Sequence, residues 1–128
     1  MRNGRILVMD DHKDIRYIFS ILLNRSNYEV EVAEDGNKAI ELFNRSIEEE
    51  RLFDAIILDL NVPGGMGGAE ATEKLLEIDP ETKVIWCSGR IDNPIMINYK
   101  KYGVVSVIHK PFNNDDIYEA LSLAISSN

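Results

Sequence analysis

Two kinds of apolar segment alternate along the chain. Four short runs are continuous and rich in branched side chains, which is typical of strands covered on both faces of a parallel sheet. They are residues 6–9, 55–58, 84–87 and 104–108. Residues 28–32 (Tyr-Glu-Val-Glu-Val) alternate apolar and polar positions instead, and this alternation predicts a strand with one face exposed.

Longer segments between these runs show the three- and four-residue apolar spacing of amphipathic helices. The positions that mark five helices are Ile15, Ile18, Phe19 and Leu22; Ala39, Phe43 and Ile47; Ala71, Leu75 and Ile78; Ile95 and Tyr99, after Asp92 or Asn93; and Ile117, Leu121, Ala124 and Ile125. We expect Asp35 to cap the second helix, Pro80 to end the third and residues 113–116 (Asn-Asn-Asp-Asp) to begin the fifth. Strands and helices in strict alternation predict an α/β doubly wound parallel sheet, with its site at the carboxyl edge.

Composition narrows the class of protein. The length of 128 residues predicts one domain, residues 1–128, and the formal net charge of −8 disfavours direct binding to nucleic acid or to an anionic membrane surface. The single cysteine, Cys87, excludes an internal disulfide and a thiolate-rich metal site. No apolar run approaches the length of a membrane span and no signal peptide is recognisable, so we expect a soluble cytoplasmic domain.

Polar side chains follow four of the five predicted strands. Asp10 and Asp11 follow the first, Asp59 the third, Ser88 the fourth and Lys110 the fifth. A single aspartate at a strand end is ordinarily a cap, but three gathered carboxylates repel one another by about 4 kcal/mol per pair at ~4 Å and need a counter-charge. Mg²⁺ suits such oxygen ligands, Lys110 suits a phosphoryl oxygen, and Asp59 suits the role of a carboxylate nucleophile that forms an aspartyl phosphate.

Four motifs in this order resemble the receiver domain of two-component response regulators. They are residues 6–11 (Ile-Leu-Val-Met-Asp-Asp), 59–63 (Asp-Leu-Asn-Val-Pro), 87–89 (Cys-Ser-Gly) and 110–112 (Lys-Pro-Phe). The resemblance covers essentially the whole chain and implies a flavodoxin-like (βα)5 fold with strand order 2-1-3-4-5. It also implies a phosphoacceptor module of a two-component or phosphorelay system, served by a histidine kinase or a histidine phosphotransfer domain.

The resemblance implies a role for each site residue. Asp59 is the phosphoacceptor, and Ser88 and Lys110 contact the phosphoryl group. Asp11, Asp59 and the backbone carbonyl of Asn61 bind Mg²⁺ directly, with Asp10 nearby or acting through water. The Lys110–Pro111 bond is expected to be cis. Receivers often pair through the fourth helix, fifth strand and fifth helix, so a homodimer through that face is expected, with Tyr99, Lys100, Lys101 and Tyr118 as candidate members.

The sequence departs from the common receiver pattern at two places. Residues 63–68 (Pro-Gly-Gly-Met-Gly-Gly) are unusually rich in glycine, which predicts flexibility beside the site and is similar to receivers of hybrid sensor histidine kinases. The chain is thus interpreted as either an excised receiver or a free-standing regulator. Val107 stands where receivers commonly have an aromatic residue, which favours signal output through ordering of residues 88–93. Arg90 in that segment is expected to border the phosphoryl group.

Two other functions compete with a phosphoacceptor module that is not an enzyme on external substrates. An aspartate-nucleophile phosphatase needs a second aspartate two residues after the nucleophile, and Asn61 stands there. A receiver-like interaction module without phosphorylation would lack an acidic residue or the lysine, although Val107 keeps this alternative open for the output. His12 is expected to be solvated, and His109 to be passive with its side chain directed away from that of Lys110. Cys87 is expected to belong to the core, and Trp86 to be either in the core or half-exposed.

Overall fold

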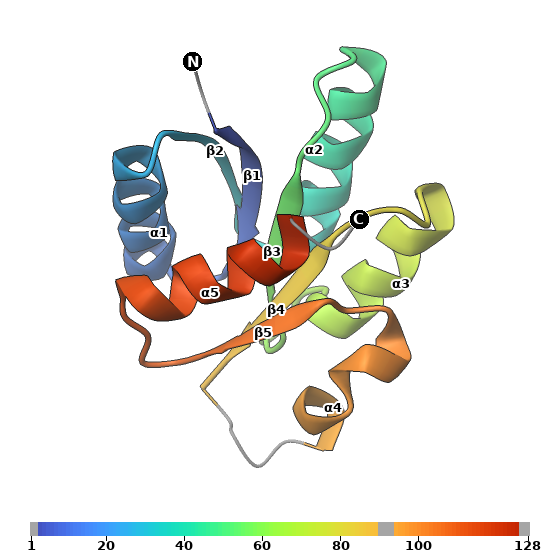
Figure 1. Cartoon of the computed structure of the whole chain (residues 1–128). Helices are drawn as coiled ribbons and strands as arrows, with labels where there is room; N and C mark the ends of the chain where they lie inside the picture. Colours follow the sequence, from blue (N-terminus) through green and yellow to red (C-terminus); the bar gives the residue numbers. More distant parts are fainter. Residues whose placement is uncertain (1–2, 90–93, 126–128) are drawn as a thin grey trace.

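The computed structural model describes residues 3–89 and 94–125. A parallel sheet of five strands runs through the middle of the molecule in the order β2-β1-β3-β4-β5 (Figure 1). The strands are β1 (Gly4–Met9), β2 (Tyr28–Ala33), β3 (Ala55–Asp59), β4 (Val84–Ser88) and β5 (Ser106–His109). The flavodoxin-like topology and the strand order 2-1-3-4-5 are therefore confirmed.

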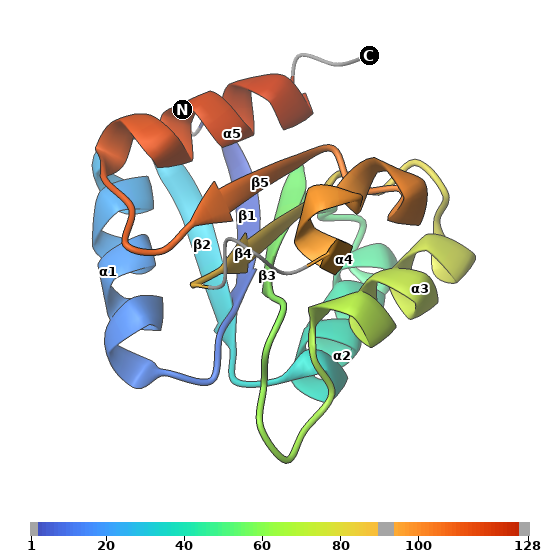
Figure 2. The ribbon, with the colours of Figure 1, turned by 90° about the horizontal axis from the view of Figure 1, so that it is seen from below.

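Helices cover both faces of the sheet. They are α1 (Lys13–Arg25), α2 (Gly36–Glu48), α3 (Gly68–Ile78), α4 (Pro94–Ile97), the 3₁₀ turn η1 (Tyr99–Tyr102) and α5 (Asn114–Ile125). Figure 2 shows α1 and α5 on one side of the sheet and α2, α3 and α4 on the other. Alternate residues of β1 feed the two core layers, because Ile6 and Val8 pack with the α1–α5 layer and Leu7 and Met9 with the α2–α3 layer.

The expected helix boundaries hold where a specific residue sets them. Asp35 caps α2 by accepting a hydrogen bond from the backbone N–H of Lys38 at 2.9 Å, and α3 ends at Ile78, two residues before Pro80. At the start of α5, Asn113 and Asp116 each accept a hydrogen bond from the other's backbone N–H at 2.9 Å. This reciprocal pair satisfies two of the free N–H groups at the helix start.

The buried faces of the helices differ from the predicted apolar stripes at the edges of each stripe. Ile18, Ile47 and Ile78 are about 40% exposed (41%, 39% and 42%), and Leu23 and Leu42 are buried instead. A stripe of i, i+3, i+4 and i+7 positions spans more than 100° of a helix, so its outer members reach past a flat sheet into solvent. The fourth helix is likewise shorter than expected, since it stops at Ile97 and Tyr99 begins the 3₁₀ turn; its expected start at Asp92 or Asn93 lies outside the described residues.

None of the helices described in residues 3–89 and 94–125 combines the length and apolar character needed to cross a membrane.

Candidate functional site

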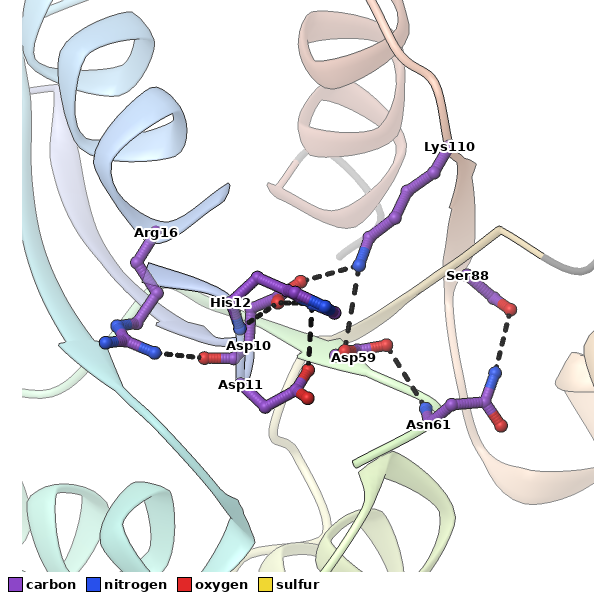
Figure 3. A network of polar contacts seen from close by, with 8 residues as sticks. All are labelled: Asp10, Asp11, His12, Arg16, Asp59, Asn61, Ser88 and Lys110. Atoms are coloured by element: carbon purple, nitrogen blue, oxygen red, sulfur yellow. Dashed lines mark hydrogen bonds and ion pairs between the residues drawn. The ribbon is translucent and has the colours of Figure 1, made fainter. Parts of the chain in front are cut away.

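The carboxyl edge of the sheet brings five polar residues from four strands together (Figure 3). Asp10 and Asp11 directly follow β1, Asp59 is the last residue of β3, Ser88 is the last residue of β4, and Lys110 directly follows β5. The carboxyl ends of parallel strands lie at the same edge of the sheet, so residues far apart in the sequence meet there.

Asp59 is buried, with only 3% of its surface exposed. Its Oδ1 accepts a hydrogen bond from the backbone N–H of Asn61 at 3.1 Å, and its Oδ2 lies 3.6 Å from Nζ of Lys110. Burial raises the pKa of Asp59 to about 6, and the negative charge of Asp10 adds to this rise while the Asn61 N–H and Lys110 oppose it. The carboxyl is still largely ionised at neutral pH, which is the form a nucleophile requires.

Lys110 is held by Asp10 more closely than by Asp59. Its Nζ donates a hydrogen bond to Oδ2 of Asp10 at 2.7 Å, and the Asp10 side chain is only 1% exposed. Burial works to lower the pKa of Lys110, but its hydrogen bond with Asp10 and the charges of Asp10 and Asp59 outweigh burial and raise that pKa. The lysine therefore stays a cation at the centre of the site.

A cation fits beside these acids. Asp10, Asp11, His12 and Asp59 each offer one ligand atom, and these atoms all lie within 4.8 Å of one another. Oδ1 of Asp11 is buried and has no hydrogen-bond partner among the residues that the structure describes, although Nδ1 of His12 lies 3.1 Å away. A buried carboxylate oxygen without a donor is unfavourable unless a cation approaches it, so the donor set is suited to a divalent ion.

The turn after β1 is fixed by two contacts to Asp10. Its Oδ1 accepts a hydrogen bond from the backbone N–H of His12 at 2.8 Å, and its backbone carbonyl accepts one from Nη1 of Arg16 at 2.7 Å. Sequence reasoning did not single out Arg16. No sequence signal distinguishes this arginine, because an arginine in the first turns of a helix is ordinarily solvated.

Ser88 joins the site through Asn61. The Asn61 side-chain amide donates a hydrogen bond to Oγ of Ser88 at 3.3 Å, so the ends of β3 and β4 are linked (Figure 3). Ser88 is fully buried, and its hydroxyl lies on the side of Asp59 away from the Asp10–Asp11 turn.

The glycine-rich loop has a packing role at its end, in addition to the predicted flexibility. A Cβ atom on Gly68 would lie 2.8 Å from the backbone oxygen of Asp59, and one on Gly67 would lie 2.8 Å from that of Leu60. Only residues without a side chain allow the start of α3 to approach β3 this closely. Gly64, with φ of +74°, serves the turn itself.

Below the site, β4 supplies core residues. Cys87 and Trp86 are buried, as expected, and burial raises the pKa of the Cys87 thiol to about 12. Nε1 of Trp86 donates a hydrogen bond to Oγ1 of Thr72 at 2.8 Å, and its ring lies 5.3 Å from that of Tyr102. Trp86 thus ties β4 to α3 and to η1.

Other residues named in the sequence analysis lie around the site and on the neighbouring faces. The Lys110–Pro111 bond is cis, as expected, and His109 is exposed. Tyr118 is not on the α4–β5–α5 face, because its hydroxyl is hydrogen-bonded to Ser26 at the end of α1, whereas Tyr99 does line a hollow beside β5 and α5. His12 is exposed but lies beside the acid pair. Arg90 and the rest of residues 90–93 lie outside the described part of the chain.

Comparison with known proteins identifies the family. The model of the response regulator receiver domain matches residues 6–122. The chain is 30% identical over 119 residues to the chemotaxis protein CheY of Thermotoga maritima, covering 92% of this chain and 94% of that protein. It is 29% identical over 130 residues to the sporulation initiation phosphotransferase F of Bacillus subtilis, covering 100% of both.

Solved structures agree. A receiver domain protein from Clostridium thermocellum superimposes with a TM-score of 0.85 at 27% identity, covering 95% of this chain and 94% of that one. The chain belongs to the response regulator receiver domain family. It is a phosphoacceptor signalling module of two-component systems.

Proposed function

We propose that Asp59 is the residue that takes the phosphoryl group. The observation that carries this proposal is the buried carboxylate of Asp59 at the end of β3, with the Lys110 ammonium 3.6 Å away and the Asp10–Asp11 pair beside it. The Asp59 side chain lies between the Asp10–Asp11 turn and the Asn61–Ser88 pair (Figure 3). We also propose that residues 1–128 form one receiver domain.

The chemistry is a transfer between two nucleophiles. An Oδ atom of Asp59 attacks the phosphorus of a phosphohistidine on a histidine kinase or histidine phosphotransfer domain; the P–N bond breaks, and the imidazole leaves with its electron pair. Lys110 is placed to neutralise a phosphoryl oxygen, and the Ser88 hydroxyl to donate a hydrogen bond to another. The aspartyl phosphate is later hydrolysed within the same site, so no external substrate is turned over.

The metal in this proposal is Mg²⁺. Asp10, Asp11 and Asp59 would hold it together with the backbone carbonyl of Asn61, and the buried Oδ1 of Asp11 supports this assignment. When bound, Mg²⁺ supplies positive charge to the phosphoryl oxygens and offsets repulsion among the acids. A homodimer through the α4–β5–α5 face is part of the proposal, with Tyr99 and Leu123 lining the hollow there.

Intact mass after incubation with acetyl phosphate and Mg²⁺ tests the proposal. We expect the mass of one phosphoryl group to be gained by the native protein and by Asp54→Asn, and not by Asp59→Asn. Asp54 is the matched control because it stands before the opposite end of β3, where it accepts a hydrogen bond from the backbone N–H of Arg5 at 2.7 Å. Labelling of Asp59→Asn, or labelling that persists in EDTA, would contradict the proposal.

A further inference from the structure

The His12 side chain contacts the acid pair instead of capping its own helix. His12 is the N-cap residue of α1, where a side chain that accepts a hydrogen bond from the helix is favoured, yet the imidazole makes no capping hydrogen bond. The side chain is 68% exposed. Its Nδ1 nevertheless points back to the acid pair, 3.1 Å from Oδ1 of Asp11 and 3.3 Å from Oδ1 of Asp10 (Figure 3).

These separations match the spacing of neighbouring ligands around one ion. With metal–ligand bonds of about 2.1 Å, two ligands at right angles lie about 3 Å apart. Oδ1 of Asp11 is also the buried oxygen that has no hydrogen-bond partner among the described residues. The imidazole nitrogen and this oxygen are therefore close enough to bind one ion together.

We propose that His12 is a metal ligand through Nδ1, and that it gives this receiver a site for transition ions such as Zn²⁺, Ni²⁺ or Co²⁺ in addition to Mg²⁺. The inference rests on the metal site of the proposed function and names the residue that sets its ion preference. Imidazole nitrogen suits these ions, whereas Mg²⁺ prefers oxygen ligands and keeps several waters. A mixed nitrogen and carboxylate set therefore favours the transition ions.

The opposing explanation is that His12 acts only as a nearby positive charge or as a brace for the turn. A brace would influence every ion alike, because it would act through the position of Asp10 and Asp11. A ligand influences only the ions that accept nitrogen. The ratio of two affinities in one protein therefore separates the two roles.

The test compares His12→Ala with His109→Ala, since the chain has 2 histidines and His109 is exposed beyond the site. Calorimetric titrations with ZnCl₂ and with MgCl₂ are run on each protein. We expect His12→Ala to lose at least about 10-fold in Zn²⁺ affinity and less than about 2-fold in Mg²⁺ affinity, and His109→Ala to match the native protein. The buried, protonated Cys87 thiol does not compete.

NMR spectroscopy tests directly whether Nδ1 of His12 binds the metal ion. In long-range ¹H–¹⁵N spectra, saturating Zn²⁺ should shift the Nδ1 resonance of His12 and leave that of His109 in place. An unchanged His12 resonance, or a Zn²⁺ to Mg²⁺ affinity ratio equal in His12→Ala and native protein, would overturn the inference. The proposed function would still hold in that case if Asp59 gains a phosphoryl group with Mg²⁺. Absence of both Mg²⁺ binding and labelling would refute the proposed function itself.

Discussion

The Lys110 ammonium lies 2.7 Å from Oδ2 of Asp10 and 3.6 Å from Oδ2 of Asp59. The lysine is thus hydrogen-bonded to a residue proposed to hold the metal, and is only close to the proposed phosphoacceptor. A cation in that position neutralises charge in the acid cluster and is within short reach of a group added to Asp59. We therefore expect this side chain to influence metal binding and phosphoryl transfer in opposite directions.

Replacing Lys110 with methionine removes the charge and keeps an unbranched side chain. We expect Lys110→Met to bind Mg²⁺ more tightly, because the acids lose their internal counter-charge. We also expect it to be labelled by acetyl phosphate at least about 100-fold more slowly, as when one donor to a developing charge is deleted. Magnesium titration and the time course of intact mass measure the two effects. Lys100→Met, on the exposed η1 turn, should change neither; an unaltered labelling rate in Lys110→Met would contradict the prediction.

The pKa of Asp59 predicts how stability depends on pH without metal. This pKa rises from 3.8 to about 6 on folding, so between these values the native state binds more protons than the unfolded state and stability falls as pH rises. Above about pH 7 the ionised carboxylate destabilises the native protein, and we expect Asp59→Asn to raise the free energy of unfolding by about 2 kcal/mol. Near pH 4 the two proteins should be closely similar. Urea unfolding in EDTA at both pH values measures this difference.

Magnesium provides the control for that comparison. If Mg²⁺ binds the ionised acids as proposed, adding it at ~100 times its dissociation constant should stabilise the native protein by about 2.7 kcal/mol and Asp59→Asn much less. The advantage of Asp59→Asn should then shrink or reverse. A variant that remains more stable by the same amount at both pH values, with and without Mg²⁺, would show that its effect is not electrostatic.

The hydrogen bond between Trp86 and Thr72 predicts a local core defect. Thr72→Val keeps the shape of the side chain but leaves the indole N–H of the fully buried Trp86 without its 2.8 Å partner. An unsatisfied buried donor costs about 1–3 kcal/mol, which urea unfolding followed by tryptophan fluorescence would detect. Thr82→Val is the matched control, because Thr82 is only half-buried and its hydroxyl bonds a local carbonyl. Equal destabilisation by the two variants would argue against a special role for the Trp86 contact.

The close approach of Gly68 to Asp59 predicts a variant that affects the site through the backbone. The added Cβ of Gly68→Ala would meet backbone atoms 2.8 Å away, and backbone cannot give way as a flexible side chain does. We expect a loss of about 1–3 kcal/mol in stability together with slower labelling of Asp59. In Gly65→Ala the nearest atom is a side-chain carbon of Val62 at 3.3 Å, so this control should be nearly neutral. Native-like labelling and stability of Gly68→Ala would disprove the packing role.

The sequence was sufficient to predict the sheet and the gathering of the acids. Continuous apolar runs alternating with helical segments are typical of a doubly wound fold. Parallel strands end at one edge of the sheet, which predicts that Asp10, Asp59 and Lys110 lie at the same edge. Side-chain direction around a helix relative to its neighbours could not be predicted. Tyr118 shows this, because its position in α5 is outward by periodicity, and only the packing of α1 against α5 decides that it meets Ser26.

Contacts made by backbone geometry were equally inaccessible to sequence. Glycine at positions 67 and 68 is compatible with a mobile loop or with a tight contact, and only the distance to β3 distinguishes them. The orientation of His12 depends on the turn that Asp10 and Arg16 fix. The short α4 was misjudged because four residues are too few to show a helical period.

The pairing of Asp10 with Lys110 joins residues 100 positions apart in the chain. A nascent or truncated chain that lacks β5 has the acids of β1 and β3 but not the cation that completes their site. If Lys110 has its proposed role, a chain without the last strand should receive a phosphoryl group much more slowly than the complete fold does. Efficient phosphoryl transfer would then depend on complete folding of the domain.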